Sequence, residues 1–250
     1  MTATGDRLNG SENGSGNASR LRRLAQRSTD ARLEAQERCE LCSEPIPAEH
    51  RHLLDLDTQE LMCACRACTI LFNRDAAGGG HYRLVPDRRL HIDDFRLADP
   101  EWEGLHIPVD MAFFFHSTPA ERVVAFYPSP MGATESLLTL ETWRRIEDAN
   151  PVLREMEHDV EALLVNRARG AREYRLVPID ECYALVGLIR SRWRGLTGGK
   201  EVWEEIARFL EALDRRSRHA SADGIAGMRH DDAKRSATHA AGKDRQRCRT

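Results

Sequence analysis

Apolar residues recur at helical spacing in the C-terminal third of the chain. One set runs from Cys182 to Trp193 at i, i+3, i+4, i+7 and i+11, which predicts an amphipathic helix. Asp180 precedes this set and is expected to cap the helix, because aspartate favours the N-cap position. A second set runs from Val202 to Leu213 and predicts another helix with one buried face.

Runs of β-branched and aromatic residues predict strands in the middle of the chain. The residues between 109–116 and 122–127 are polar, so these two runs are expected to form a hairpin. The segment 127–136 is expected to be a loop, and Thr139 is expected to cap a further helix. The remaining strands are predicted at 51–56, 60–62, 81–85, 160–165 and 174–177. This order of strands and helices favours the α+β class.

The pattern divides the chain into four parts. Residues 1–38 are polar and predict a disordered tail and linker, and residues 39–77 hold a dense group of cysteines. Residues 78–215 carry the strands and helices of the α+β domain. Residues 216–250 lack apolar periodicity and predict a second disordered tail.

Charge and hydropathy argue against two classes of protein, those that bind nucleic acid and those that span a membrane. The net charge is −3, and basic residues outnumber acidic ones in both tails, so the central part of the chain is acidic. An acidic core argues against nucleic-acid binding. The sequence contains no run close to the roughly 20 apolar residues that span a bilayer, and no apolar stretch typical of a signal peptide. A cytoplasmic location is therefore expected.

Four cysteines form the motif that carries chemistry. Cys39 and Cys42 make one C-x₂-C unit, and Cys65 and Cys68 make a second. Two such units supply the four thiolates that tetrahedral zinc prefers, and they leave no coordination position for water. The sequence therefore predicts a structural zinc site. A first cysteine pair, a hairpin and a helix carrying the second pair are typical of a treble-clef-like zinc module.

Three alternatives remain open around this motif. Cys63 lies two residues before Cys65 and is an alternative ligand. His50 and His52 lie between the cysteine pairs, and histidines in the hairpin of a treble clef also occur in HNH-like nucleases. Two C-x₂-C units also suit iron, as in a rubredoxin-like electron carrier. Ser43 and Thr69 argue against iron, since rubredoxins place glycine after each pair.

A second candidate site lies where the two C-terminal helices meet. Trp193 and Arg194 end the first of these helices, and Gly198 and Gly199 turn the chain into the second. An aromatic and a basic side chain at such a corner suit partner binding. No nucleophile–base motif, zinc-protease motif or dinucleotide fingerprint is present, so the chain is expected not to be an enzyme.

These motifs resemble an uncharacterised actinobacterial family whose genes lie beside those of uptake nickel–iron hydrogenases. The resemblance runs from residue 38 to about residue 213 and is carried by 39–42, 63–68, 125–136, 178–183 and 193–199. It implies an accessory or assembly protein whose partners are hydrogenase subunits or maturation proteins. It implies no catalytic residue.

Overall fold

The computed structural model describes residues 37–72, 80–138, 140–195 and 198–224. Most of both predicted tails, the predicted cap Thr139 and Cys248 lie outside the described residues. The described part of the chain is a mixed structure of strands and helices, as the hydrophobic pattern predicts. None of its helices is long and apolar enough to cross a membrane.

A seven-stranded sheet forms the centre of the larger part of the protein. Its order is β10-β4-β9-β8-β5-β6-β7, and all neighbours are antiparallel except β10 and β4. The predicted hairpin of β5 and β6 is confirmed, with Phe114 directly opposite Ala125. The strands are β4 (Leu90–Ile92), β5 (Met111–Ser117), β6 (Arg122–Ser129), β7 (Gly132–Ser136), β8 (Glu161–Asn166), β9 (Glu173–Pro178) and β10 (Arg218–Ala220).

Both faces of this sheet are buried, which explains the continuous apolar runs in its central strands. Successive side chains of a strand point to opposite faces. Phe113 and Phe115 therefore join the core on one face, whereas Phe114 joins the core on the other. All three are at most 6% exposed. The sheet thus separates two hydrophobic cores.

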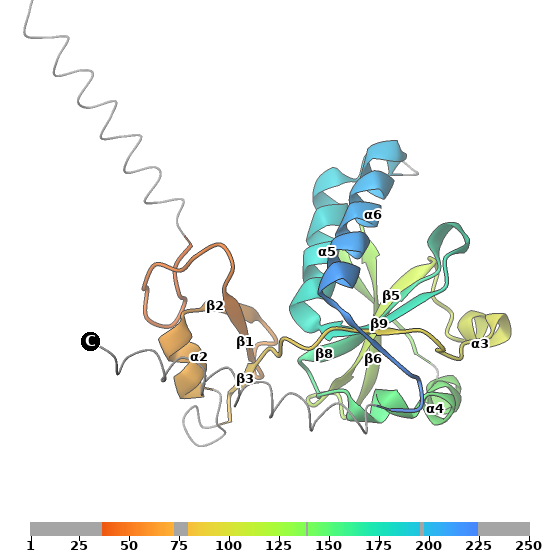
Figure 1. Ribbon diagram of the computed structural model, residues 1–250, viewed down its shortest axis with the longest axis horizontal. Coiled ribbons are helices and arrows are strands. Elements are labelled where there is room, and N and C mark those ends of the chain that lie inside the picture. The colour runs from red at the N-terminus through yellow and green to blue at the C-terminus, as the bar shows by residue number, and fades with distance from the viewer. Residues whose placement is uncertain (1–36, 73–79, 139, 196–197, 225–250) are drawn as a thin grey trace, which may run out of the picture.

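Helices cover the two faces unequally. The long helices α5 (Ile179–Arg192) and α6 (Gly199–Arg216) lie side by side over one face (Figure 1). The other core includes Trp102 of α3 (Asp99–Gly104), Trp143 of α4 (Leu140–Ala149), and Leu153 of the 3₁₀ helix Pro151–Glu155. The predicted helices around Cys182 and Val202 are confirmed.

The cysteine-rich part folds around a small sheet of its own. Its strands are β1 (Arg51–Asp55), β2 (Leu61–Ala64) and β3 (Tyr82–Leu84), in the order β2-β1-β3, and the helix α2 (Arg66–Phe72) follows β2. The predicted hairpin between β1 and β2 is confirmed. The sequence pattern assigns 81–85 to the larger domain, but in the structure β3 pairs with β1. This pairing joins residues almost 30 positions apart, so the local pattern does not reveal it.

The small sheet is docked onto the larger part. Leu54 of β1 and Val85 lie in the same core cluster as Cys182 of α5. Arginines of β3 and of the segment that follows it reinforce this contact. Arg83 of β3 donates to the carboxylate of Asp159, whose side chain is completely buried. Arg88 and Arg89 bind Glu161 and Glu181 in the same way. The cysteine-rich part therefore has a defined position against α5.

Three segments differ from the sequence-based expectation. The predicted loop 127–136 is the end of β6 and all of β7, joined by a tight turn in which the Ser129 hydroxyl donates to the Gly132 carbonyl. The first residues after 216 form β10. Asp180 lies inside the first turn of α5 rather than at its cap, which is Pro178. The Asp180 side chain is therefore available for another partner.

Candidate metal centre

A tight turn presents the first cysteine pair. Arg38 and Pro45 form an isolated β-bridge that closes the turn, and the Cys39 amide donates to the Glu44 carbonyl at 2.9 Å. Ser43 has a φ of 61°, a left-handed conformation that bends the chain directly after Cys42. Both sulfurs of the pair are thereby turned to the same side.

The second pair is presented where a strand becomes a helix. β2 ends at Ala64 and α2 begins at Arg66, so Cys65 lies at the junction and Cys68 in the first helical turn. The Cys68 amide donates to the Cys65 sulfur at 3.5 Å. Burial and the neighbouring cysteine side chains raise the pKa of the Cys68 thiol above its usual value.

Glu40 holds the two pairs together. Its amide donates to the Cys63 carbonyl at 2.9 Å, and its carboxylate accepts the Cys63 amide. Since Glu40 lies between the first two cysteines and Cys63 at the end of β2, these bonds fix the first turn against the hairpin. The convergence of the two pairs is thus built into the backbone.

The four sulfurs form one group. The Sγ atoms of Cys39, Cys42, Cys65 and Cys68 all lie within 4.8 Å of one another, and the Cys42–Cys65 separation is 3.6 Å. Tetrahedral zinc–sulfur bonds of about 2.3 Å place sulfurs about 3.8 Å apart. The cysteines of the described residues are free thiols. Four close cysteines of this kind can bind a metal ion.

The environment of Cys39 favours its thiolate. Burial alone would raise the pKa of Cys39, which is 1% exposed. Hydrogen bonds from the backbone amides of Cys65, Cys42 and Leu41 outweigh burial and lower the pKa to about 6. Metal ligation requires the thiolate, and the backbone amides around Cys39 stabilise that form of this one cysteine.

The other sequence-based candidates lie elsewhere. The structure groups Cys63 with His50 and His52 rather than with the four cysteines. Cys182 is completely buried in the core beneath α5, as its place on an apolar helix face predicts.

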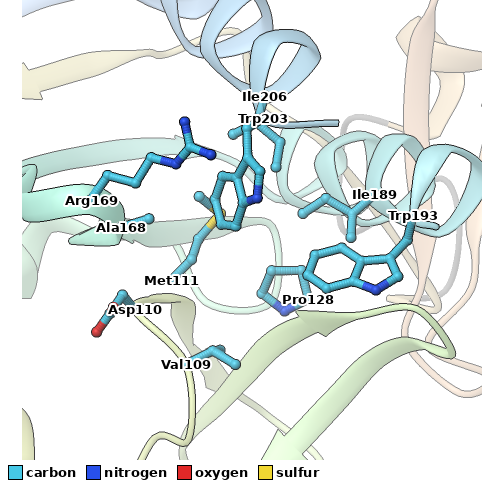
Figure 2. Close-up of a pocket in the computed structure, with 10 residues that line it drawn as sticks. All are labelled: Val109, Asp110, Met111, Pro128, Ala168, Arg169, Ile189, Trp193, Trp203 and Ile206. Carbon is cyan, nitrogen blue, oxygen red and sulfur yellow. The ribbon is translucent and has the colours of Figure 1, made fainter. Parts of the chain in front are cut away.

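The corner at the end of α5 borders an apolar pocket of about 310 Å³. Figure 2 shows the indole of Trp193 beside Pro128, and the indole of Trp203 beside Met111 and the side chain of Arg169. The two indole centroids are 6.3 Å apart, in an edge-to-face arrangement. The Arg169 guanidinium lies 4.8 Å from the centre of the Trp203 ring, a cation–π contact. Arg169 and Asp110 are the charged residues that line the pocket.

The sequence identifies only part of this pocket. The sequence pattern places Trp203 on the buried face of a helix. It places Arg169 and Pro128 in segments that are distant from this helix along the chain. One feature of the sequence does indicate the pocket: Trp193 and Trp203 lie on either side of a short glycine-containing turn, which brings both indoles to the same end of the helix pair. Arg194 and Gly199 are exposed and do not line the pocket.

Comparison with known proteins adds the family. The family of unknown function DUF5947 matches residues 38–217. The chain belongs to this family. Searches of curated proteins and of solved structures found no match. The DUF5947 match begins one residue before Cys39 and extends past the end of α6, so it includes both the cysteine cluster and the pocket.

In this DUF5947 protein, Gly198 supports the pocket wall by its shape. It has a φ of 81°, and a Cβ atom there would lie 2.8 Å from Val202 Cγ1 and 2.9 Å from Trp193 Cε3. Gly198→Ala is therefore expected to destabilise the protein by about 1–3 kcal/mol, since it combines a left-handed backbone with a steric overlap.

Thermal unfolding with tryptophan fluorescence measures both the loss of stability and the displacement of Trp193. Gly199→Ala is the matched control, because Gly199 also has a positive φ, but a Cβ atom there would meet no atom of the described residues within 4 Å. If both variants lose the same stability, the contact with Trp193 contributes nothing.

Proposed function

We propose that this protein is a non-enzymatic zinc-binding accessory or assembly factor for a nickel–iron uptake hydrogenase. The observation that carries the proposal is the group of four cysteine sulfurs within 4.8 Å. A four-cysteine zinc site is closed and has a structural role. The link to hydrogenase rests on the family resemblance described from the sequence, whose genes lie beside hydrogenase genes.

Zinc fits the geometry better than the iron of a rubredoxin-like carrier. The first pair lies in a tight turn, but the second pair begins a helix. A turn, the β1–β2 hairpin and a helix carrying the second pair are the order of a treble-clef-like module, whereas a rubredoxin-like site needs two equivalent turns. The purified protein is therefore expected to be colourless, while iron bound to thiolates would make it red.

Partner binding is assigned to the pocket of Trp193 and Trp203. Tryptophan pairs that stay partly exposed beside an arginine are typical of the residues that dominate binding energy at protein interfaces. Val109, 39% exposed, extends the apolar surface at the pocket. The expected occupant is an apolar segment of a hydrogenase subunit or of a maturation protein.

Replacing Trp193 and Arg194 by alanine tests the function in cells. The double variant is expected to weaken partner binding by at least about 2 kcal/mol, roughly 30-fold, because truncation of a central tryptophan typically costs this much. Hydrogen uptake should fall to the level of the deletion strain, while zinc content stays that of the native protein. Co-purification of hydrogenase subunits with the tagged protein measures the binding directly.

Arg192→Ala is the control, because Arg192 is exposed at the end of α5 but does not line the pocket. A deletion strain with normal hydrogen uptake and normal subunit maturation would contradict the hydrogenase role. Loss of uptake with intact co-purification would instead remove the pocket from the proposal.

A further inference from the structure

A second group of metal-ligand side chains lies on the hairpin of the small sheet. His52 of β1 is directly opposite Cys63 of β2. His50 precedes His52 by two residues, so the strand periodicity directs it to the same face. One ring nitrogen of His50, one ring nitrogen of His52 and the Cys63 sulfur all lie within 4.8 Å of one another. This group shares no residue with the four-cysteine cluster, although Cys63 packs against the same small core.

Both histidines use their Nδ1 atoms for their hydrogen bonds to the described residues. His50 Nδ1 lies 3.0 Å from the Pro47 carbonyl and 3.3 Å from the Glu37 carboxylate. His52 Nδ1 lies 2.8 Å from the Asp180 carboxylate. In both rings Nδ1 therefore acts as the donor, and Nε2 carries the lone pair that can bind a metal.

His50 shows that this free nitrogen is unsatisfied. Its side chain is only 7% exposed, and its Nε2 has no hydrogen-bond partner among the described residues. A buried polar atom without a partner lowers folding stability, so such atoms are rare in native proteins. The two imidazole rings are in edge-to-face contact with centroids 4.8 Å apart, so they lie next to each other on the same face of the hairpin. A bound cation would satisfy His50 Nε2.

We propose that His50 Nε2, His52 Nε2 and the Cys63 sulfur bind a second divalent ion of the zinc type. Imidazole and thiolate are the ligands that such borderline ions prefer. Three protein ligands leave the fourth tetrahedral position open for water or an external ligand. This second site is therefore of the open kind, in contrast to the closed four-cysteine site.

The carboxylates around the group match those found behind metal-binding histidines. A ligating histidine usually donates its second N–H to a carboxylate or a carbonyl, which fixes the ring orientation and makes the free nitrogen more basic. His52 donates in this way to the Asp180 carboxylate, and His50 donates to the Pro47 carbonyl, with the Glu37 carboxylate 3.3 Å from the same nitrogen. Asp180 lies in the first turn of α5, where the helix dipole stabilises its negative charge. The larger domain thus completes a site in the small module.

Equilibrium dialysis of the full chain against zinc tests the proposal. The native protein is expected to bind two zinc ions per chain, one at each site. His52→Ala and Cys63→Ser should each bind one, because a site with two ligands is too weak to hold zinc under the same conditions. His81→Ala and Cys182→Ser are matched controls and should bind two. His81 also pairs its Nδ1 with a carboxylate, that of Asp57 at 2.8 Å, but belongs to neither group.

A second test with cobalt uses only the native protein, so its result does not depend on whether a variant folds. Cobalt(II) added to native protein that carries one equivalent of zinc, which fills the closed four-cysteine site first, should give the visible bands of a mixed nitrogen–sulfur site. It should also shift the imidazole protons of His50 and His52 in the NMR spectrum. Binding of a single ion by the native protein would overturn the proposal. So would two ions in both the His52→Ala and Cys63→Ser variants, or cobalt bands without any shift of the two imidazoles.

Discussion

Replacing Cys68 by serine is expected to remove the metal from the four-cysteine cluster and to unfold the small sheet. The buried core of this module consists of Cys39, Ile46, Leu53, Ala64 and Cys68. So small a core cannot stabilise a sheet alone. Zinc binding at structural sites contributes about 10–16 kcal/mol of folding free energy, so losing one of four ligands removes much of the stabilisation. Cys42→Ser should act in the same way.

The measurement is zinc content per chain together with limited proteolysis of residues 39–72. Cys182→Ser is the control: its sulfur is completely buried in the core of the larger domain, so the variant should lose about 1–3 kcal/mol of stability but keep its zinc. Equal loss of zinc in all three variants would show that the cysteines do not divide into ligands and a core residue.

The second large effect is expected at a buried ion pair beneath α6. Arg175 of β9 has no exposed side-chain surface, and its guanidinium makes two hydrogen bonds to the Asp214 carboxylate, at 2.6 and 2.7 Å. Removing one partner of a buried pair leaves an uncompensated charge, which typically costs 3–5 kcal/mol. Asp214→Ala should cost about 3 kcal/mol, the lower end, because Asp214 is partly exposed and Glu173 still contacts Arg175 at 3.0 Å.

Chemical denaturation measures this loss, with Asp223→Ala as control. Asp223 also pairs with an arginine, Arg96, but both side chains are more than half exposed, so the control should change stability by less than about 1 kcal/mol. Similar losses in the two variants would mean that burial of Arg175 does not strengthen its dependence on Asp214.

The same pair predicts a dependence of stability on pH. Burial alone would raise the pKa of Asp214, but hydrogen bonds from Arg175 and His91 outweigh burial and lower the pKa below its usual value. The folded state therefore binds the Asp214 proton less readily than the unfolded state. Its contribution to stability is complete at neutral pH and is lost as the pH falls through the lowered pKa. Asp214→Ala should reduce the acid sensitivity of unfolding accordingly.

Elements with strong local patterns could be predicted from the sequence. The run of Phe113, Phe114 and Phe115 identifies a strand buried on both faces, and the apolar positions of α5 and α6 identify two amphipathic helices. β7 and β10 could not be predicted in this way. Ser136 is the only buried residue of β7, and β10 contains none, so both are strands only because a neighbouring strand pairs with them.

The candidate site also has a part that the local sequence pattern predicts and a part that depends on the folded structure. The spacing of Cys39, Cys42, Cys65 and Cys68 predicts that four cysteines come together, and the structure places their sulfurs within 4.8 Å of one another. The grouping of Cys63 with His52 depends on the register of the β1–β2 hairpin, which the sequence does not specify. The contact of Asp180 with His52 joins residues 128 positions apart and needs the docked arrangement of the two parts.

The helix α5 connects the proposed histidine site with the apolar pocket. Its second residue, Asp180, forms a hydrogen bond with His52 of the small sheet, while Ile189 and the C-cap residue Trp193 line the apolar pocket. Fourteen helical residues make a rod of about 21 Å. A ligand whose entry into the pocket tilts this rod also moves Asp180 relative to His52. Thermodynamic coupling of this kind is reciprocal, so occupancy of the histidine site would change the affinity of the pocket by the same factor.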